Sequence, residues 1–353
     1  MTISKHFHTE SIAKSLLAKI FDTKGLQVKF FESWHPDLDE ALNLLPEEEI
    51  CPHELFRMLC QVPGLFKKQI ILVKKRDDSI AVACFRRNFN YWVPVTHFIV
   101  PGFLFPVKEN YIGQILSVIG SFIHYKIGWW RWRMPPPHVQ WIRSLYSEPT
   151  YAASCSGDFE KYWRQNGNFK DVRLFRNRCK NFNLKINLRD SAEWTIKNSE
   201  AKWRLSGIGE TPGLKERLLA SKYLEMRGLY HTLSLVDQQE LTAAISFIIH
   251  HNDAVAYVNY RNPHYDRYGV MTHLMESSFY WARDMGFDKI DWGGSFDYKN
   301  KWAPEDNKKW MLDVCRTDIL VREYSFGLLR KAEIKIKKEL NKVAIKLRKD
   351  SVD

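Results

Sequence analysis

The stretch Asp291–Ala303, which reads DWGGSFDYKNKWA, decides the fold class of this 353-residue chain. Residues 285–290 before it are expected to end an amphipathic helix and enter a short apolar strand. The run therefore leaves the carboxyl end of a strand, where α/β sheets bind ligands. Its two adjacent glycines let the backbone approach a ligand closely. A simple turn would explain those glycines, but not Tyr298, Lys299 and Trp302 as well.

Each half of the chain contains a predicted β-hairpin. In the first half, residues 70–84 form two apolar strands joined by a polar Asp-Asp-Ser turn. In the second half, residues 232–236 and 241–250 flank the polar turn 237–240. Further strands and a helix follow in each half, so the layout indicates two copies of one βαβ-containing unit.

Residues 241–303 carry a family resemblance. They combine strands at 241–250 and 254–260, the loop RNPHY at 261–265, a helix at 269–285 and the run that begins at Asp291. This segment resembles the FemAB-like branch of the GNAT acyltransferase superfamily, and within it the CelD-type acetyltransferases. The resemblance implies an α/β fold of two tandem GNAT-like lobes, each a mixed sheet flanked by helices.

The predicted domain organisation has four parts. They are an N-terminal lobe at 1–156, a basic helical connector at 157–189, a C-terminal lobe at 190–325 and a basic amphipathic tail helix at 326–353. In the tail, an apolar stripe that includes Leu340 and Leu347 is surrounded by lysines. Such a helix either packs on the second lobe or lies on an anionic membrane surface.

Composition narrows the class of protein. The chain is 45% hydrophobic and 14% aromatic, so it can bury a large core. Its six cysteines form no C-x-x-C pair and have no histidines at zinc-finger spacing, which predicts reduced thiols, no metal and a cytoplasmic protein. The apolar runs at 98–107 and 111–123 are shorter than the roughly 20 residues that span a bilayer. The protein is therefore expected to be soluble, or peripheral at the inner face of the membrane.

The net charge of +12 favours a phosphate-bearing partner. Coenzyme A, a sugar nucleotide, tRNA and anionic lipid all fit, and charge alone does not choose among them. Residues 159–189 are rich in arginine and lysine beside apolar residues at helical spacing. From this basic face Arg173 and Arg176 are predicted to hold a phosphate in a groove between the lobes, the alternative being a solvated surface.

The start of the helix near residue 269 is the expected anion cradle, because free N–H groups and the helix dipole favour a pyrophosphate there. Its members are Arg267, Gly269, Val270 and Met271. In the GNAT phosphate loop an arginine or glutamine is followed three residues later by glycine and five residues later by glycine or alanine. Here Asp266 and Met271 hold the first and last of these positions, so both acyl-CoA and aminoacyl-tRNA stay open as donors. A glycine that only caps the helix is the alternative.

The resemblance also implies roles for residues of the second half. In Fem-type peptidyltransferases an aromatic residue and a lysine take the place of Tyr298 and Lys299, where the ring stacks on the donor and the ammonium stabilises charge. Asp291 is the candidate base or an orienting group. The predicted acceptor-side residues are Tyr260, Arg261, Tyr265 and Trp302.

These features predict an N-acyltransferase that moves an acyl group, from acyl-CoA, to an amine of a cell-envelope or polysaccharide precursor, with a small molecule or glycan as acceptor. The first alternative is a Fem-type peptidyltransferase that uses aminoacyl-tRNA, although the second half has no heptad run long enough for the coiled coil of many such enzymes. The second alternative is a non-catalytic accessory protein of a polysaccharide system. The oligomeric state stays open.

Overall fold

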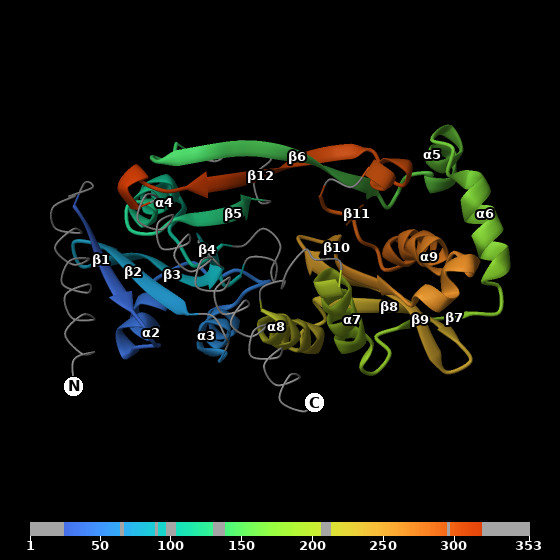
Figure 1. Cartoon of the computed structure of the whole chain (residues 1–353), viewed down its shortest axis with the longest axis horizontal. Helices are drawn as coiled ribbons and strands as arrows, with labels where there is room; N and C mark the ends of the chain where they lie inside the picture. Colours follow the sequence, from blue (N-terminus) through green and yellow to red (C-terminus); the bar gives the residue numbers. More distant parts are fainter. Residues whose placement is uncertain are drawn as a thin grey trace, which may run out of the picture.

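The computed structural model describes residues 25–63, 67–88, 91–96, 104–129, 138–205, 213–294 and 297–319. The predicted tail helix lies outside these residues. Within them, twelve strands form one sheet in the order β1-β2-β3-β4-β5-β12-β6-β11-β10-β9-β8-β7. Both parallel and antiparallel pairs occur in the sheet, and helices flank it, so the predicted α/β class with mixed strands is confirmed (Figure 1).

The first half of the sheet contains the first predicted hairpin, β2–β3, whose strands pair from Lys68↔Arg86 to Lys75↔Asp78. Most residues of β2 are buried on both faces, which matches its continuous apolar sequence. The elements of this half are β1 (Leu26–Phe31), α2 (Pro36–Leu42), α3 (His53–Gln61), β2 (Lys68–Lys75), β3 (Asp78–Asn88), β4 (Tyr91–Pro94), η1 (Glu109–Tyr111), α4 (Ile112–Gly120) and β5 (Tyr125–Trp129).

The second half contains the second predicted hairpin, β8–β9, in a sheet with helices on both faces. Alternate residues of β9 separate the two faces: Phe247 packs in the core beneath α9, and Ile248 in the core beside α8. The elements are α5 (Phe159–Gln165), α6 (Phe169–Arg178), β7 (Asn183–Ile186), α7 (Ser191–Leu205), α8 (Leu214–Met226), β8 (Tyr230–Asp237), β9 (Glu240–His250), β10 (Asp253–Arg261), η2 (Pro263–Tyr268), α9 (Val270–Asp284), β11 (Lys289–Asp291) and η3 (Asp297–Lys301).

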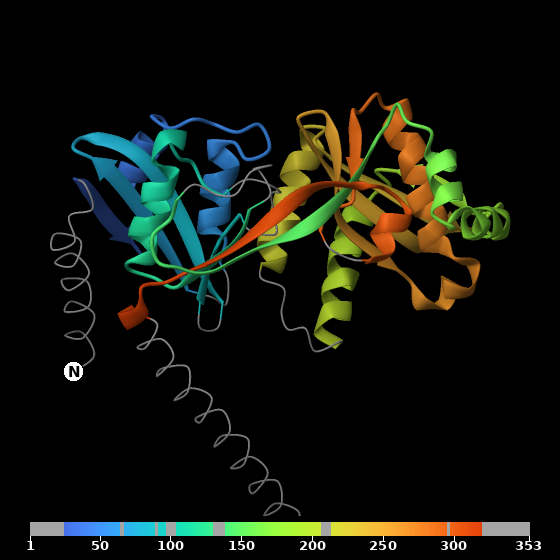
Figure 2. The same ribbon diagram turned by 90° about the horizontal axis from the view of Figure 1, so that it is seen from above.

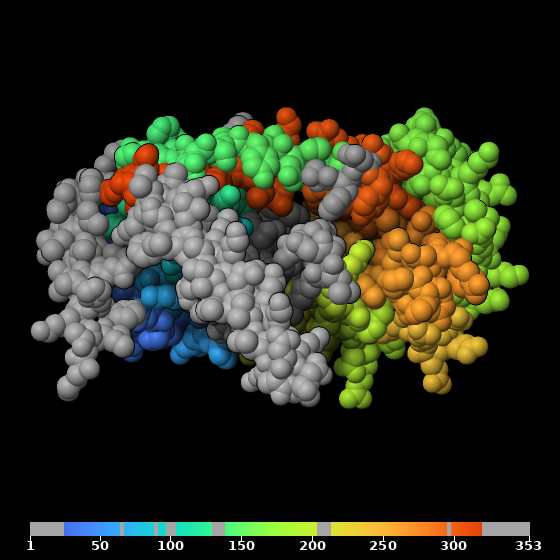
Figure 3. Space-filling model, viewed as in Figure 1, coloured from blue at the N-terminus to red at the C-terminus, as the bar shows by residue number. Residues whose placement is uncertain are grey.

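Two long strands join the halves. Strand β6 (Ile142–Ser154) pairs with β12 (Glu305–Val314) along most of its length and with β11 at its far end. Strand β12 also pairs with β5 of the first half. Figure 2 shows the two strands as a twisted ribbon that crosses from one half to the other, and Figure 3 shows their side chains along the upper edge. Strand β12, which follows the second half in sequence, therefore extends the sheet of the first half.

The predicted position of the basic helical segment is wrong. Helices α5 and α6 lie at the outer end of the second half, and β6 is the element that crosses between the halves (Figure 1). The reason lies in the packing of α6, whose buried Val172 belongs to the core around α9. The boundaries of the two lobes stay a prediction.

No helix in the described ranges is both long and apolar enough to cross a membrane.

Candidate active site

The sheet opens at the carboxyl end of β11. Strands β10 and β11 run parallel and pair at only three positions, the last being Val255↔Asp291. Strand β10 then continues to Arg261, and residues 256–261 pair only with β9 within the described part of the chain. A bulge between Ala256 and Val258 marks the point where the strands diverge. The unpaired edge of β10 and the end of β11 thus face the same opening in the sheet.

Asp291 is the last residue of β11 and is partly buried. Its Oδ1 accepts a hydrogen bond of 2.6 Å from the backbone N–H of Gly293, whose positive φ of 65° turns the chain back. Burial raises the pKa of Asp291 to about 6, although this hydrogen bond and the nearby Lys299 ammonium oppose the rise. The carboxyl group therefore titrates close to neutral pH.

Lys299 lies in η3 with only 9% of its surface exposed. Its Nζ donates a hydrogen bond to the backbone carbonyl of Trp292, the residue after the strand end. Burial lowers the pKa of Lys299 to about 8; Asp291 opposes the shift, and the positive charge of Lys309 adds to it. A buried acid and a buried amine, both with pKa values displaced toward neutrality, thus stand together at this opening.

Two further charged residues belong to the site and were not predicted from the sequence. Lys309 of β12 and Glu148 of β6 are direct cross-strand partners. Burial lowers the pKa of Lys309, and the Glu148 carboxylate opposes that shift. The polar residues at 305–309 are a weak signal in the sequence for Lys309. The pairing of β6 with β12 places Lys309 near Lys299 and Glu148 beside Gly294.

Tyr298 and Arg261 also meet at the opening. Tyr298 is 47% exposed, and its phenol pKa is raised by burial while the positive charge of Arg261 opposes the rise. Arg261 itself pairs with Asp266, with 2.7 Å between Nε and Oδ1. The structure therefore brings together four of the predicted residues: Asp291, Tyr298, Lys299 and Arg261.

The other predicted acceptor-side residues lie elsewhere. Trp302 is 5% exposed and stacks on Phe279 in the core, so its assignment to substrate binding is wrong. The ring of Tyr260 packs against Trp194 of α7. The hydroxyl of Tyr265 donates a hydrogen bond of 2.8 Å to Glu240 at the β8–β9 turn, which holds this ring at the outer end of the hairpin.

The start of α9, where the sequence predicts an anion cradle, is covered by a side chain at its glycine. A Cβ on Gly269 would collide with the ring of Phe175, because α6 packs against this glycine. The guanidinium of Arg267 is occupied by the ring and hydroxyl of Tyr268. The Gly269 N–H itself donates to the Asp266 carbonyl, so this one donor of the predicted cradle is already used. Val270 is fully buried, and Met271 packs at the edge of the same core.

The two connector arginines are not in a groove between the lobes. Arg176 donates a hydrogen bond of 2.6 Å from Nε to Glu276 of α9 and also pairs with Glu160. These hydrogen bonds raise the pKa of Arg176. Arg173 is exposed on the outer side of α6. Arg176 thus fastens α6 to α9, and the predicted phosphate role has no support from its position.

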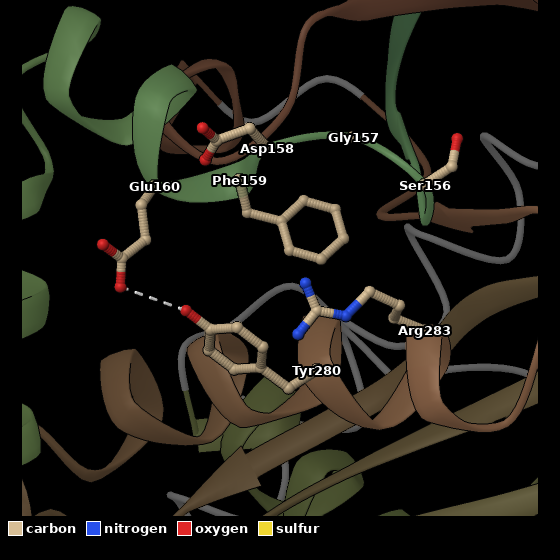
Figure 4. Close-up of a pocket in the computed structure, with 7 residues that line it drawn as sticks. All are labelled: Ser156, Gly157, Asp158, Phe159, Glu160, Tyr280 and Arg283. Atoms are coloured by element: carbon tan, nitrogen blue, oxygen red, sulfur yellow. Dashed lines mark hydrogen bonds between the residues drawn. The ribbon is translucent and has the colours of Figure 1, made fainter.

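A cavity of about 420 Å³ lies at the opposite end of β11. It is lined by Ser156, Gly157, Asp158, Phe159, Glu160, Tyr280 and Arg283. Figure 4 shows the Arg283 guanidinium between the rings of Phe159 and Tyr280, with the Tyr280 hydroxyl bonded to Glu160. Both of its carboxylates already have partners outside the cavity: Glu160 pairs with Arg164 and Arg176, and Asp158 accepts a hydrogen bond from the Lys161 N–H. No group of three or more metal-ligating side chains occurs among the residues that the structure describes.

No protein-family model and no curated protein matches the sequence. Among solved structures, the fold is similar to that of L-PGS from Bacillus licheniformis, at 12% identity and a TM-score of 0.49 over 84% of this chain and 97% of that one. It is also similar to FemX, at 9% identity and a TM-score of 0.44 over 83% and 99% of the two chains. A tandem GNAT protein from the clavulanic acid biosynthesis pathway gives 8% identity and a TM-score of 0.43 over 82% and 100%. The likeness to these structures is one of fold.

Proposed function

We propose that this protein is an acyltransferase that moves an acyl or aminoacyl group onto an amine, with its chemistry at the carboxyl end of β11. One observation carries the proposal. Asp291 and Lys299 are held together where β10 and β11 diverge, and burial moves their pKa values to about 6 and about 8. Displaced pKa values of this kind are typical of acid–base catalysts rather than of stabilising ion pairs.

Acyl transfer to an amine needs a base and a group that stabilises negative charge, and Asp291 and Lys299 suit these two roles. As the amine nitrogen attacks the carbonyl carbon of the donor, a C–N bond forms and the bond to the thiol or hydroxyl leaving group breaks. The Asp291 carboxylate accepts the proton that the amine loses. The Lys299 ammonium stabilises the negative charge that develops on the carbonyl oxygen, and the leaving group takes up the proton afterwards.

The open edge of β10 suits the binding of an extended ligand. Residues 256–261 present backbone N–H and C=O groups on the side that β11 has left. An elongated donor or acceptor could pair with them as a further strand would. Tyr298 and Arg261 flank the same opening, which supports roles in stacking and charge binding.

The reaction site is argued from the structure, whereas the identities of the donor and the acceptor are proposed from the family resemblance. We propose an amine of a cell-envelope or polysaccharide precursor as acceptor. Phe175 covers Gly269 at the start of α9, so a donor esterified to tRNA is kept beside acyl-CoA as the second candidate. The net charge of +12 suits either polyanionic donor. Attachment to the inner face of the membrane stays a prediction, since the tail is outside the described residues.

A donor screen tests the proposal. The full chain is scanned for thermal unfolding with acetyl-CoA, longer acyl-CoAs and aminoacyl-tRNA, because a bound donor raises the unfolding temperature. Donors that bind are then incubated with a panel of amines, and acyl transfer is followed by mass spectrometry. Transfer that is lost in Asp291→Asn while donor binding persists would support catalysis at this site. Binding without transfer to any amine would favour the non-catalytic alternative instead.

A further inference from the structure

A second cluster of charges is buried where the two halves meet, on elements different from those of the β11 site. Lys68 of β2 and Arg86 of β3 are cross-strand partners, so their side chains lie on the same face of the sheet. Both reach Glu216 in the first turn of α8: its Oε1 lies 3.1 Å from Lys68 Nζ and 3.3 Å from Arg86 Nη1. Arg86 is 1% exposed and Glu216 is 3% exposed. Figure 1 shows α8 beside α3, at the junction of the halves.

Positive charge exceeds negative charge in this cluster. Lys68 has an acceptor for each ammonium hydrogen, because Nζ also donates at 2.7 Å to the carbonyls of Leu59 and Val62. Arg86 differs, since none of its three side-chain nitrogens has an acceptor in hydrogen-bonding geometry within the described residues. Its one carboxylate neighbour, Glu216, is shared with Lys68. A buried cation with unsatisfied donors is costly, so a further acceptor is expected here.

The positive end of α8 faces the same guanidinium. Gly213 caps this helix with a φ of 83°, and a Cβ on it would collide with Arg86 Nη1. The guanidinium thus lies against the first turn of a thirteen-residue helix, whose backbone N–H groups carry partial positive charge. Among the described residues, Glu216 is the one carboxylate within ion-pair distance of both cations.

We propose that this cluster is an oxyanion-binding site and that a phosphate group is what it binds. A guanidinium presents five N–H donors in a planar fork, and the helix end adds backbone donors, an arrangement that matches phosphate oxygens. Because Arg86 comes from the first half and α8 from the second, a bound phosphate would contact both. The phosphate is either free or part of a larger molecule. This site goes beyond the proposed acyl transfer and does not depend on it.

The test is a titration of the full chain with inorganic phosphate and with uridine diphosphate, at constant ionic strength maintained with potassium chloride. Calorimetry and thermal unfolding report binding. Arg86→Gln is expected to weaken phosphate binding at least about tenfold, as the loss of a charge-assisted bond does. Arg87→Gln is the matched control: it makes the same charge change one residue along β3, where the side chain stacks on Trp92, and should bind like the native protein.

A second variant makes the test independent of the folding of Arg86→Gln. Glu216→Gln removes the carboxylate that competes for Arg86, so phosphate should bind several-fold more tightly. Phosphate affinity that is unchanged or weaker in Glu216→Gln would overturn the proposal, as would a native unfolding temperature that neither anion shifts. Tighter binding of the diphosphate than of phosphate indicates a larger natural ligand, and equal binding indicates free phosphate. Each readout is binding rather than turnover, so failure here leaves the proposed acyl transfer untouched.

Discussion

At the scale of single residues, Asp291 and Lys299 behave in the opposite way to an ordinary ion pair. Attraction between opposite charges lowers the pKa of an acid and raises that of an amine. Here burial outweighs attraction, so the pKa of Asp291 rises and that of Lys299 falls. Each group is therefore held at some cost to stability, which is expected where the groups serve a reaction.

Lys299→Ala is predicted to lower turnover by about a hundredfold while the protein stays folded, because one preorganised cation is lost. The upper limb of the pH–rate profile, near pH 8, should also disappear, which a lysine that only supports the loop would not cause. Steady-state kinetics and circular dichroism measure these effects. Lys301→Ala, an exposed lysine in the same 3-10 helix η3, is the control and should retain its activity. Near-normal turnover in Lys299→Ala would remove this residue from the mechanism.

Asp291→Asn is predicted to stabilise the fold in a pH-dependent way. The folded-state pKa of Asp291 lies above its unfolded value, so its contribution to stability is fully present below about pH 4 and is lost as the pH rises through about 6. Asparagine does not ionise. The variant should therefore match the native protein near pH 4 and exceed its free energy of unfolding by roughly 2–3 kcal/mol at pH 7.5.

Urea unfolding at a series of pH values measures this difference. Asp288→Asn changes an exposed acid just before β11, and it should alter stability by less than about 0.5 kcal/mol. A difference between Asp291→Asn and the native protein that does not grow with pH would show that the carboxyl group is not held against desolvation.

At the scale of elements, the length of β11 and the placement of α6 decide the site. Strand β11 is three residues long, so β10 continues without a partner on that side in the described part of the chain. Helix α6 packs across the start of α9, where Phe175 covers Gly269. Strand β10 thus keeps an edge without a strand partner beside Asp291, while Phe175 covers Gly269 at the start of α9.

Arg176→Gln is predicted to loosen α6 from α9. Glu276 is only 3% exposed, and the variant leaves its carboxylate with the His273 ring, 3.2 Å away at Nδ1, as its remaining side-chain partner among the described residues. The expected loss in the free energy of unfolding is about 2 kcal/mol, less than for a fully buried pair because Arg176 is itself 41% exposed. Urea unfolding measures it. Arg173→Gln on the exposed side of α6 should be neutral, and equal losses in both variants would contradict this account.

At the scale of the whole molecule, the two halves share one sheet. Strand β12 follows the second half in sequence yet pairs with β5 of the first, and its Leu312 is buried in the first core. That core also includes Leu224 of α8 from the second half. The halves are therefore expected to unfold together rather than as independent domains.

Leu312→Ala is predicted to destabilise both halves at once. The side chain is 2% exposed, so truncation should cost about 2–5 kcal/mol. Because β12 joins the halves, tryptophan fluorescence and far-ultraviolet circular dichroism should report one shared unfolding transition at a lower urea concentration. Lys308→Ala, an exposed position on the same strand, is the control. Two separated transitions in the variant would show that the halves fold independently.

Patterns of neighbouring residues predicted the hairpins and the strand end at Asp291. Apolar strands around polar turns predicted both hairpins, and the glycine run after a short strand predicted the position of Asp291, Tyr298 and Lys299. These inferences succeed because strand and turn preferences depend on neighbours along the chain. The amphipathic pattern of α6 was also visible, but periodicity does not say which surface a helix covers. The sequence therefore predicts a connector between the lobes, whereas in the structure α6 packs on α9.

Other features depend on contacts between residues that are distant in sequence, so local patterns do not predict them. These features are the burial of Trp302 against Phe279, the approach of Lys309 to Lys299 and the packing of Arg86 against the start of α8. The displaced pKa values of Asp291 and Lys299 also depend on the tertiary structure, because they arise from desolvation and from charges on strands that are distant in sequence. Desolvation depends on how completely the folded chain surrounds a group, and that is a property of packing rather than of any local pattern.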